Sequence, residues 1–147
     1  MQQEKRSILV VDRSASTVFY TATLLRKLNY GVRTAASAEE ALNSIAGSAP
    51  ALVVTDAVLP GMSGADMLAR IKQNASLSFI PVIVQTASTD PAIKKACTRA
   101  GCCGYFIKPA DPDELFWAIQ SATETTPRKH IRISVALTAR IGEGGNA

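Results

Sequence analysis

Short apolar runs alternate with amphipathic stretches of helical length across most of the chain. The runs lie at residues 8–11, 32–35, 52–55, 82–85 and 104–107. Most of them are apolar at consecutive positions, which is typical of strands that are covered on both faces. The pattern therefore predicts five β/α units between residues 7 and 124, with a parallel sheet between two layers of helices.

Polar residues mark the starts of the intervening helices. Ser37 with Glu40 three positions later matches a capping box, and Ser63 precedes another amphipathic stretch. Asp111 followed by Pro112 places a capping acid before a proline at the first helical position. The core-facing positions predicted from helical spacing are Ala41, Leu42, Ile45, Met67, Leu68, Ile71, Ile93, Ala96, Cys97, Ala100, Leu115, Ala118, Ile119 and Ala122.

The connections between parallel strands are right-handed crossovers. Five short strands joined in this way favour a doubly wound α/β sheet in the order 2-1-3-4-5, with helices on both faces. In such a sheet the functional site lies beyond the carboxyl ends of the strands. Asp12, Asp56, Thr86 and Lys108 stand at the ends of the first, third, fourth and fifth runs. We expect two carboxylates, a hydroxyl and an ammonium to meet there.

Four motifs carry a family resemblance. The segment VVTDAVLPGMSG at residues 53–64 resembles the phosphoacceptor loop of response-regulator receiver domains. ILVVD at residues 8–12 resembles their first strand, Thr86-Ala87 the end of their fourth strand, and Lys108-Pro109 their lysine–proline pair. The motifs agree in order and spacing, and the resemblance covers residues 5–124. It implies one receiver domain with a flavodoxin-like fold.

The resemblance implies a phosphorylation site at Asp56. This residue would accept a phosphoryl group from a sensor histidine kinase or a phosphotransfer protein, with Lys108 and Thr86 contacting the phosphoryl oxygens. It also implies a Mg²⁺ ion held by Asp12, Asp56 and the backbone carbonyl of Val58. Such a protein is a signalling receiver and not an enzyme, with at most self-phosphorylation and self-dephosphorylation.

The residue after Asp12 departs from the family pattern. Receivers usually carry two acids at the end of the first strand, and here the pair is Asp12-Arg13. Arginine is a fixed cation that cannot bind a metal, and a cation beside a metal costs on the order of several kcal/mol. Either Arg13 turns to solvent beside a weakened magnesium site, or its guanidinium reaches Asp56 and replaces the metal charge. The alternative function is a pseudo-receiver, a phosphorylation-independent interaction module on the same fold.

Aromatic residues near the end of the domain indicate a switch and an interface. Tyr105 stands where the family carries an aromatic that moves inward on activation, as Thr86 moves towards the phosphoryl group. On the last predicted helix, Trp117 falls on the side away from the core positions. We expect Phe106, Phe116 and Trp117 to lie on a homodimer or partner surface.

The composition fits one small globular domain, with 47% hydrophobic and 19% charged residues. The longest apolar runs have the length of strands and the N-terminus is polar, so we expect no membrane partner and a cytoplasmic location. The cysteines, Cys97, Cys102 and Cys103, are odd in number and two of them are adjacent. This arrangement predicts small, buried, reduced thiols instead of a disulfide framework.

Residues 125–147 differ in character from the rest. A linker-like segment precedes apolar and polar positions that alternate strictly from 131 to 141, which predicts a half-buried strand. The mild net charge of +4 is concentrated here and predicts a basic tail, with no nucleic-acid partner. Arg128 and Arg132 have the R-x-x-x-R spacing that opens PilZ domains, so the segment resembles a truncated start of that family. It would bind cyclic diguanylate only if a complete PilZ domain followed. The other interpretations are a strand that pairs with another molecule and a basic disordered tail.

Overall fold

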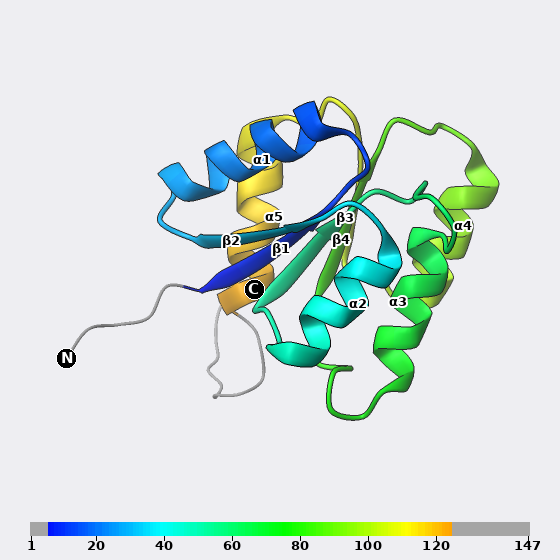
Figure 1. Ribbon diagram of the computed structural model, residues 1–147. Helices are drawn as coiled ribbons and strands as arrows, with labels where there is room; N and C mark the ends of the chain where they lie inside the picture. The colour runs from blue at the N-terminus through cyan, green and yellow to red at the C-terminus, as the bar shows by residue number, and fades with distance from the viewer. Residues whose placement is uncertain (1–5, 125–147) are drawn as a thin grey trace, which may run out of the picture.

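The computed structural model describes residues 6–124. Five parallel strands form one sheet in the order β2-β1-β3-β4-β5, as the sequence predicts (Figure 1). The strands are β1 (Ser7–Val11), β2 (Gly31–Ala35), β3 (Leu52–Thr55), β4 (Val82–Thr86) and β5 (Gly104–Ile107). The strands alternate with five helices, α1 (Ala15–Lys27), α2 (Ala38–Gly47), α3 (Gly64–Gln73), α4 (Pro91–Ala100) and α5 (Pro112–Glu124). The doubly wound fold class is confirmed.

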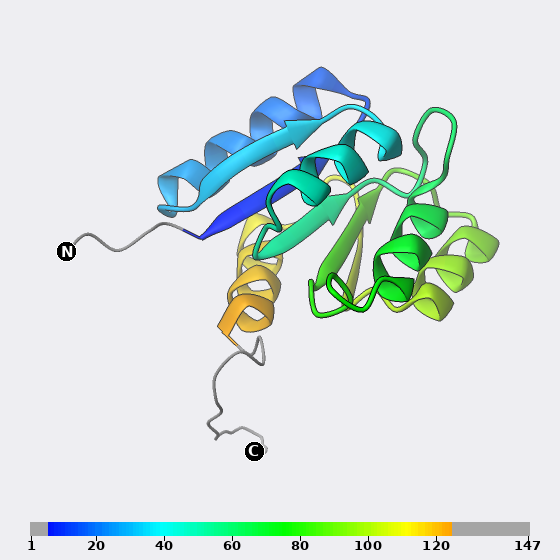
Figure 2. The ribbon, with the colours of Figure 1, turned by 60° about the horizontal axis from the view of Figure 1, so that its bottom comes forward.

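The sheet is buried on both faces because successive side chains of a strand point to opposite sides. Leu9 and Val11 pack with the buried residues of α2 and α3. Ile8 and Val10 lie in a second core with Leu25 of α1 and the apolar side of α5. Figures 1 and 2 show the resulting layers, with α1 and α5 on one face of the sheet and α2 and α3 on the other. This two-sided burial is the physical reason for consecutive apolar positions in the strands.

The predicted helix caps form, with one difference in detail. The Ser37 hydroxyl accepts a hydrogen bond from the Glu40 backbone N–H at 3.1 Å, and Ser63 accepts one from Asp66 at 3.1 Å. The Glu40 carboxylate bonds to the backbone N–H of Ala36 at 2.9 Å, one residue before the cap. A reciprocal capping box would place that bond at Ser37 itself. The bond therefore ties α2 to the chain leaving β2.

Helix α4 departs from the prediction. Cys97 is fully buried, whereas Ala96, predicted to face the core, is exposed. The small core beneath α4 has three buried residues, Ala57, Val84 and Cys97, and Ile93 packs against it, so a narrow stripe of the helix is enough to close it. The prediction that all three cysteines are buried holds for Cys97 only, because Cys102 is partly buried and Cys103 is exposed, while all three thiols are free.

The predictions for residues 125–147 lie outside the described residues. They comprise the linker, the half-buried strand, the start of a PilZ domain and its ligand. Residues 6–124 correspond closely to the predicted receiver unit of residues 5–124. Within them, no helix is both long and apolar enough to span a membrane.

Candidate functional site

Four predicted site residues meet at the carboxyl edge of the sheet. Backbone hydrogen bonds continue the strand pairing by one residue there, and thereby fix the positions of three side chains. The Asp12 N–H bonds to Ala35 at 3.0 Å, Asp56 to Val11 at 2.9 Å and Lys108 to Thr86 at 2.8 Å. The side chains at the ends of β1, β3 and β5 consequently start from adjacent points on one edge.

The Lys108 ammonium lies between the two carboxylates. Its Nζ is 2.6 Å from Asp12 Oδ2 and 2.9 Å from Asp56 Oδ2. The Asp12 side chain is 2% exposed and the Asp56 side chain 10%, so the pairs are only partly screened by water. Bonds of this kind are short and strong because both partners are charged. One cation thus holds two acids that would otherwise repel each other.

The second oxygen of each carboxylate is fixed by the backbone. Asp12 Oδ1 accepts from the Ser14 N–H at 2.9 Å, and Asp56 Oδ1 accepts from the Val58 N–H at 2.9 Å. Ser14 caps α1, so the position of Asp12 is coupled to the start of that helix. Both carboxylates therefore have one oxygen on Lys108 and one on a loop amide, which orients them.

The environment keeps Asp56 ionised. Burial raises the pKa of this carboxyl, but the Thr86 side chain, the Val58 N–H and the Lys108 ammonium outweigh it, so that the pKa is lowered below 3.8. Burial lowers the pKa of Lys108, and hydrogen bonds to Asp12 and Asp56 outweigh it, so that the pKa is raised above 10.5. At neutral pH Asp56 is therefore a carboxylate and Lys108 an ammonium.

Thr86 completes the edge from β4. The residue is 1% exposed, and its hydroxyl oxygen accepts from the Ser88 N–H at 3.3 Å. The hydroxyl proton is donated to the Asp56 carboxylate, which is how Thr86 helps to lower the pKa of that acid. The sequence therefore identified a side chain that the structure brings to the same edge as Lys108.

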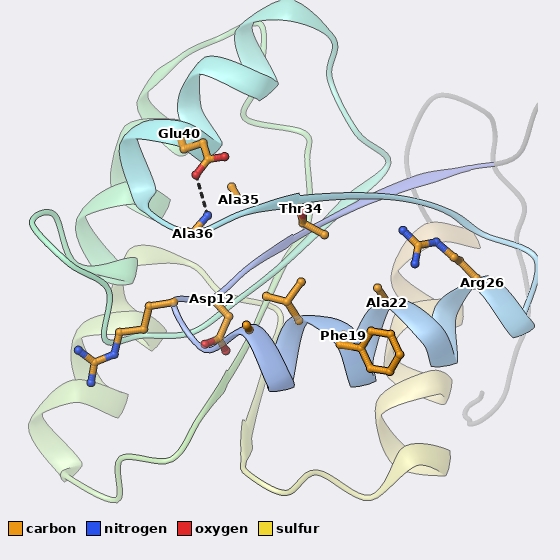
Figure 3. A pocket seen from close by; sticks show the side chains of 11 residues that line it. Asp12, Phe19, Ala22, Arg26, Thr34, Ala35, Ala36 and Glu40 are labelled. Carbon is orange, nitrogen blue, oxygen red and sulfur yellow. Dashed lines mark hydrogen bonds between the residues drawn. The ribbon is translucent and has the colours of Figure 1, made fainter.

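Arg13 is exposed and stands beside this cluster. Within residues 6–124, the ion pair of Asp56 is with Lys108, and Arg13 takes part in none. The interpretation in which the Arg13 guanidinium reaches Asp56 is therefore wrong for this structure, and Lys108 has that role. Arg13 and Asp12 line a pocket of about 380 Å³ between α1, the end of β2 and the start of α2. Figure 3 shows this pocket, with Phe19 and Arg26 of α1 on one side and Glu40 of α2 on the other.

The oxygen donors at the edge fit a divalent cation. Asp12 and Asp56 supply carboxylate oxygens near one point, and carboxylates are preferred ligands of Mg²⁺. The set is small, because residues 6–124 hold no cluster of three or more His, Cys, Asp and Glu side chains suited to a metal. Lys108 already offsets one negative charge, and Arg13 adds a further positive charge nearby. The carboxylate oxygens of Asp12 and Asp56 are thus of the kind that a magnesium ion takes.

A glycine that sequence reasoning did not single out shapes the loop after Asp56. A Cβ on Gly64 would clash with the Asp56 backbone oxygen and would lie 2.9 Å from the Ala57 Cα. The Gly64 N–H donates to the Ala57 carbonyl at 2.9 Å, which folds the start of α3 onto the loop that follows Asp56. The motif at residues 53–64 contains this glycine, but only the structure shows why a side chain is excluded.

The predicted switch and interface residues lie on β5 and α5. Tyr105 is partly buried, and its hydroxyl is buried without a partner within the described residues. The Lys94 ammonium of α4 lies 5.7 Å from the centre of its ring. Trp117 is 69% exposed, whereas Phe106 and Phe116 are partly buried and Phe106 packs against the α1–α5 core. Of the three predicted interface residues, Trp117 alone is exposed.

The fold and the edge cluster define a receiver-type α/β signalling domain, and comparison with known proteins agrees. Residues 8–120 match the response regulator receiver domain family, and the chain belongs to that family. Members of this family are signalling regulators and not enzymes.

Individual relatives support the assignment. A two-component response regulator of Oryza sativa subsp. japonica is 31% identical over 116 residues, which span 77% of this chain and 68% of that protein. A probable transcriptional regulator of Cyanophora paradoxa is 35% identical over 126 residues, which span 86% of this chain and 52% of that protein. A signal receiver domain from Pseudomonas fluorescens Pf-5 superimposes with a TM-score of 0.80 and 30% identity, over 86% of this chain and all of that one.

Proposed function

We propose that Asp56 accepts a phosphoryl group from a histidine kinase or phosphotransfer protein, and that the domain relays this event as a conformational or association switch. The observation that carries the proposal is the position of Lys108 Nζ, 2.9 Å from Asp56 Oδ2 and 2.6 Å from Asp12 Oδ2. An ionised carboxylate beside a fixed ammonium is a nucleophile with charge stabilisation already in place. Because the kinase draws on ATP, the proposal places the exchange in the cytoplasm.

The transfer requires positioning more than covalent chemistry. An Asp56 carboxylate oxygen attacks phosphorus, the bond from phosphorus to the donor nitrogen breaks, and the donor imidazole retains the electron pair. Lys108 then leaves its carboxylate contacts in part to pair with a phosphoryl oxygen. The Thr86 hydroxyl, which already acts as a hydrogen-bond partner of Asp56, donates to another phosphoryl oxygen.

Magnesium would bind at the same edge. Asp12, Asp56 and the Val58 carbonyl would hold it, and it would supply positive charge against the transferring phosphoryl group. The ion must compete with Lys108 for the oxygens of both acids. We therefore expect weak magnesium binding and slow phosphorylation compared with a receiver that has a second acid in place of Arg13.

One observation favours a second function. The two acids of the edge are already held by Lys108, and exposed Arg13 adds positive charge beside them. The site is therefore near electrical balance without a metal ion or a phosphoryl group. A pseudo-receiver, which keeps the fold as an interaction module without phosphorylation, would need no more than this.

Intact-mass analysis separates the two functions. The protein is incubated with a small phosphodonor such as phosphoramidate, with and without Mg²⁺, alongside Asp56→Asn. A magnesium-dependent phosphoryl adduct that is lost in Asp56→Asn supports the phosphorylated receiver. No adduct under any condition, in a protein that unfolds cooperatively, supports the pseudo-receiver.

The association surface proposed for the relay lies around α5. Trp117 is exposed on this helix, and Ile107 at the end of β5 is 43% exposed. Large aromatic side chains in contact surfaces contribute much of the binding energy. Sedimentation of the phosphorylated wild type and of phosphorylated Trp117→Ala measures whether the protein forms a homodimer through this surface. Phe116 is not mutated, because it is partly buried. An association state that Trp117→Ala does not alter counts against this surface.

A further inference from the structure

A second polar pair is buried between α1 and the sheet. The Gln85 amide of β4 donates from Nε2 to the Thr21 hydroxyl of α1 at 3.1 Å. Gln85 is 5% exposed and Thr21 is 2% exposed. The fully buried side chains of the neighbouring core on this face are all aliphatic. Leucine and valine would pack there without losing hydrogen bonds to water, so the pair carries a desolvation cost that packing alone does not explain.

The Gln85 amide keeps hydrogen-bonding capacity that the protein does not use. A primary amide has two N–H donors and a carbonyl oxygen that accepts. Within residues 6–124, the side chain makes one hydrogen bond, the one to Thr21. At least one N–H and the oxygen are therefore open. The oxygen is not one of the side-chain atoms buried without a partner, so it is open to solvent in the space beside it and available to a ligand.

Gln85 and Thr21 both line a pocket of about 370 Å³ between α1 and the segment that joins β5 to α5. This volume lies within the range of small-molecule sites. Apolar walls come from Leu24 of α1, Leu115 of α5 and Pro109 between them. Tyr20, which is 56% exposed, adds an aromatic side chain to the same lining. The pocket thus combines a polar floor with apolar walls.

The charge of the lining selects against an ionic ligand. Lys108 is the charged residue of the pocket wall, and its ammonium is already bound to Asp12 and Asp56 at 2.6 and 2.9 Å. An anion would have to compete with both carboxylates for it. The open amide of Gln85, by contrast, is neutral and presents a donor and an acceptor side by side.

We propose that this pocket binds a small, neutral, planar molecule with an amide-type edge, such as a lactam or a nucleobase-like heterocycle. The ligand carbonyl accepts from Gln85 Nε2 and the ligand N–H donates to Gln85 Oε1. Its ring lies between the apolar walls, and Tyr20 covers part of it. Binding does not require phosphorylation of Asp56, although the ligand lies beside Lys108.

Quinolin-2(1H)-one and its N-methyl derivative test the proposal as a matched pair. They share the ring and the carbonyl, but only the first has an N–H. In a titration of the full-length ¹⁵N-labelled protein, we expect quinolin-2(1H)-one to shift the backbone amide signals of Thr21 and Leu24 saturably, and in the wild type also the side-chain amide signals of Gln85, with a Kd on the order of 1 mM. The N-methyl derivative should bind about tenfold more weakly, because it cannot donate to Oε1.

Gln85→Leu, Thr21→Val and Thr34→Val locate the site. Gln85→Leu removes the amide at similar volume, and should abolish the preference for the N–H compound. Thr21→Val should weaken that preference, because the amide loses the bond that orients it. Thr34→Val is the control, because Thr34 is exposed and lines the pocket of Figure 3 instead. It should leave both affinities unchanged.

Three results would overturn the proposal. These are the absence of any saturable shift, equal affinity for the two compounds, and shifts confined to the pocket around Phe19 and Arg26. The proposal would also be overturned by a Gln85→Leu protein that still prefers the N–H compound. Thermal unfolding of each variant establishes which proteins are folded. If Gln85→Leu does not fold, the affinities of wild type and Thr21→Val for the two compounds still test the proposal.

Discussion

Asp12 and Asp56 lie on either side of a single ammonium, with Lys108 Nζ 2.6 Å from one carboxylate and 2.9 Å from the other. Each carboxylate is nearly buried, and the second oxygen of each accepts a hydrogen bond from a backbone N–H. The two acids are therefore coupled through Lys108, and any change at one of the three groups alters the other two.

Lys108→Met should destabilise the protein. The variant keeps an unbranched side chain but leaves two buried carboxylates without a cation, and we expect a loss of about 1–3 kcal/mol in the free energy of unfolding. Asp56→Asn should recover part of that loss in the double variant, because only one charged acid then remains. Urea denaturation of the four proteins measures the coupling free energy. Strictly additive effects would contradict the shared ammonium.

The strand ends of this domain could be predicted from the sequence, but the contacts between them could not. Consecutive apolar positions identified the strands, and the crossover rule then placed Asp12, Asp56, Thr86 and Lys108 at one edge. Which carboxylate oxygen Lys108 approaches depends on side-chain torsions that no periodicity records. The sequence showed Arg13 beside Asp12, but not that Lys108 would be the cation that binds Asp56.

Contacts between distant residues were hidden for the same reason. Gln85 belongs to an apolar run and Thr21 to a helical stretch, and nothing local indicates that they meet across 64 positions of sequence. The exposed Ala96 shows the converse error, since helical spacing overstated how much of α4 the small core beneath it needs. Periodicity predicts which side of an element is apolar, while the neighbouring elements decide how much of that side is covered.

The stability of the protein should depend on pH through Asp56. Its folded-state pKa is lowered below the ordinary 3.8, so its contribution to stability is present above that value and is lost as the pH falls through the folded-state pKa. The difference in free energy of unfolding between wild type and Asp56→Asn should stay constant from about pH 7 to about pH 5. Below about pH 4 the wild type should lose free energy of unfolding relative to Asp56→Asn. Denaturation at a series of pH values measures this difference. A change in it centred near pH 6 would contradict the assignment of the effect to Asp56.

The three thiols should react at very different rates. Cys97 is fully buried, and burial raises its pKa to about 11, while Cys103 is exposed. At pH 8 iodoacetamide should modify Cys103 first and Cys97 last, with Cys97 slower by at least about 100-fold because both its thiolate fraction and its access are reduced. Peptide mass spectrometry after timed quenching follows each site. Denatured protein is the control, in which the three rates should converge.

Gly64→Ala should be strongly destabilising, whereas Gly47→Ala should not. A Cβ at Gly64 meets the backbone of Asp56 and Ala57, neither of which can move without displacing the loop after β3. We expect a loss of about 2–3 kcal/mol at this position. Nothing lies within 4 Å of a Cβ at Gly47, the last residue of α2, so alanine there should be neutral or stabilising by up to about 1 kcal/mol. Thermal unfolding compares the pair, and equal losses would contradict the close approach at Gly64.

Arg13→Asp should strengthen magnesium binding at the carboxyl edge. The change removes a positive charge next to Asp12 and adds an acid that can contribute oxygen ligands, so we expect the affinity for Mg²⁺ to rise by at least about tenfold. Arg26→Asp is the matched control. It makes the same charge change in the same pocket, but Arg26 is near the other end of α1, about 20 Å along the helix, and salt screens most of its effect. Calorimetric titration with MgCl₂ measures both. Equal gains in the two variants would show that net charge alone sets the affinity, and that Arg13 does not occupy the position of a metal ligand.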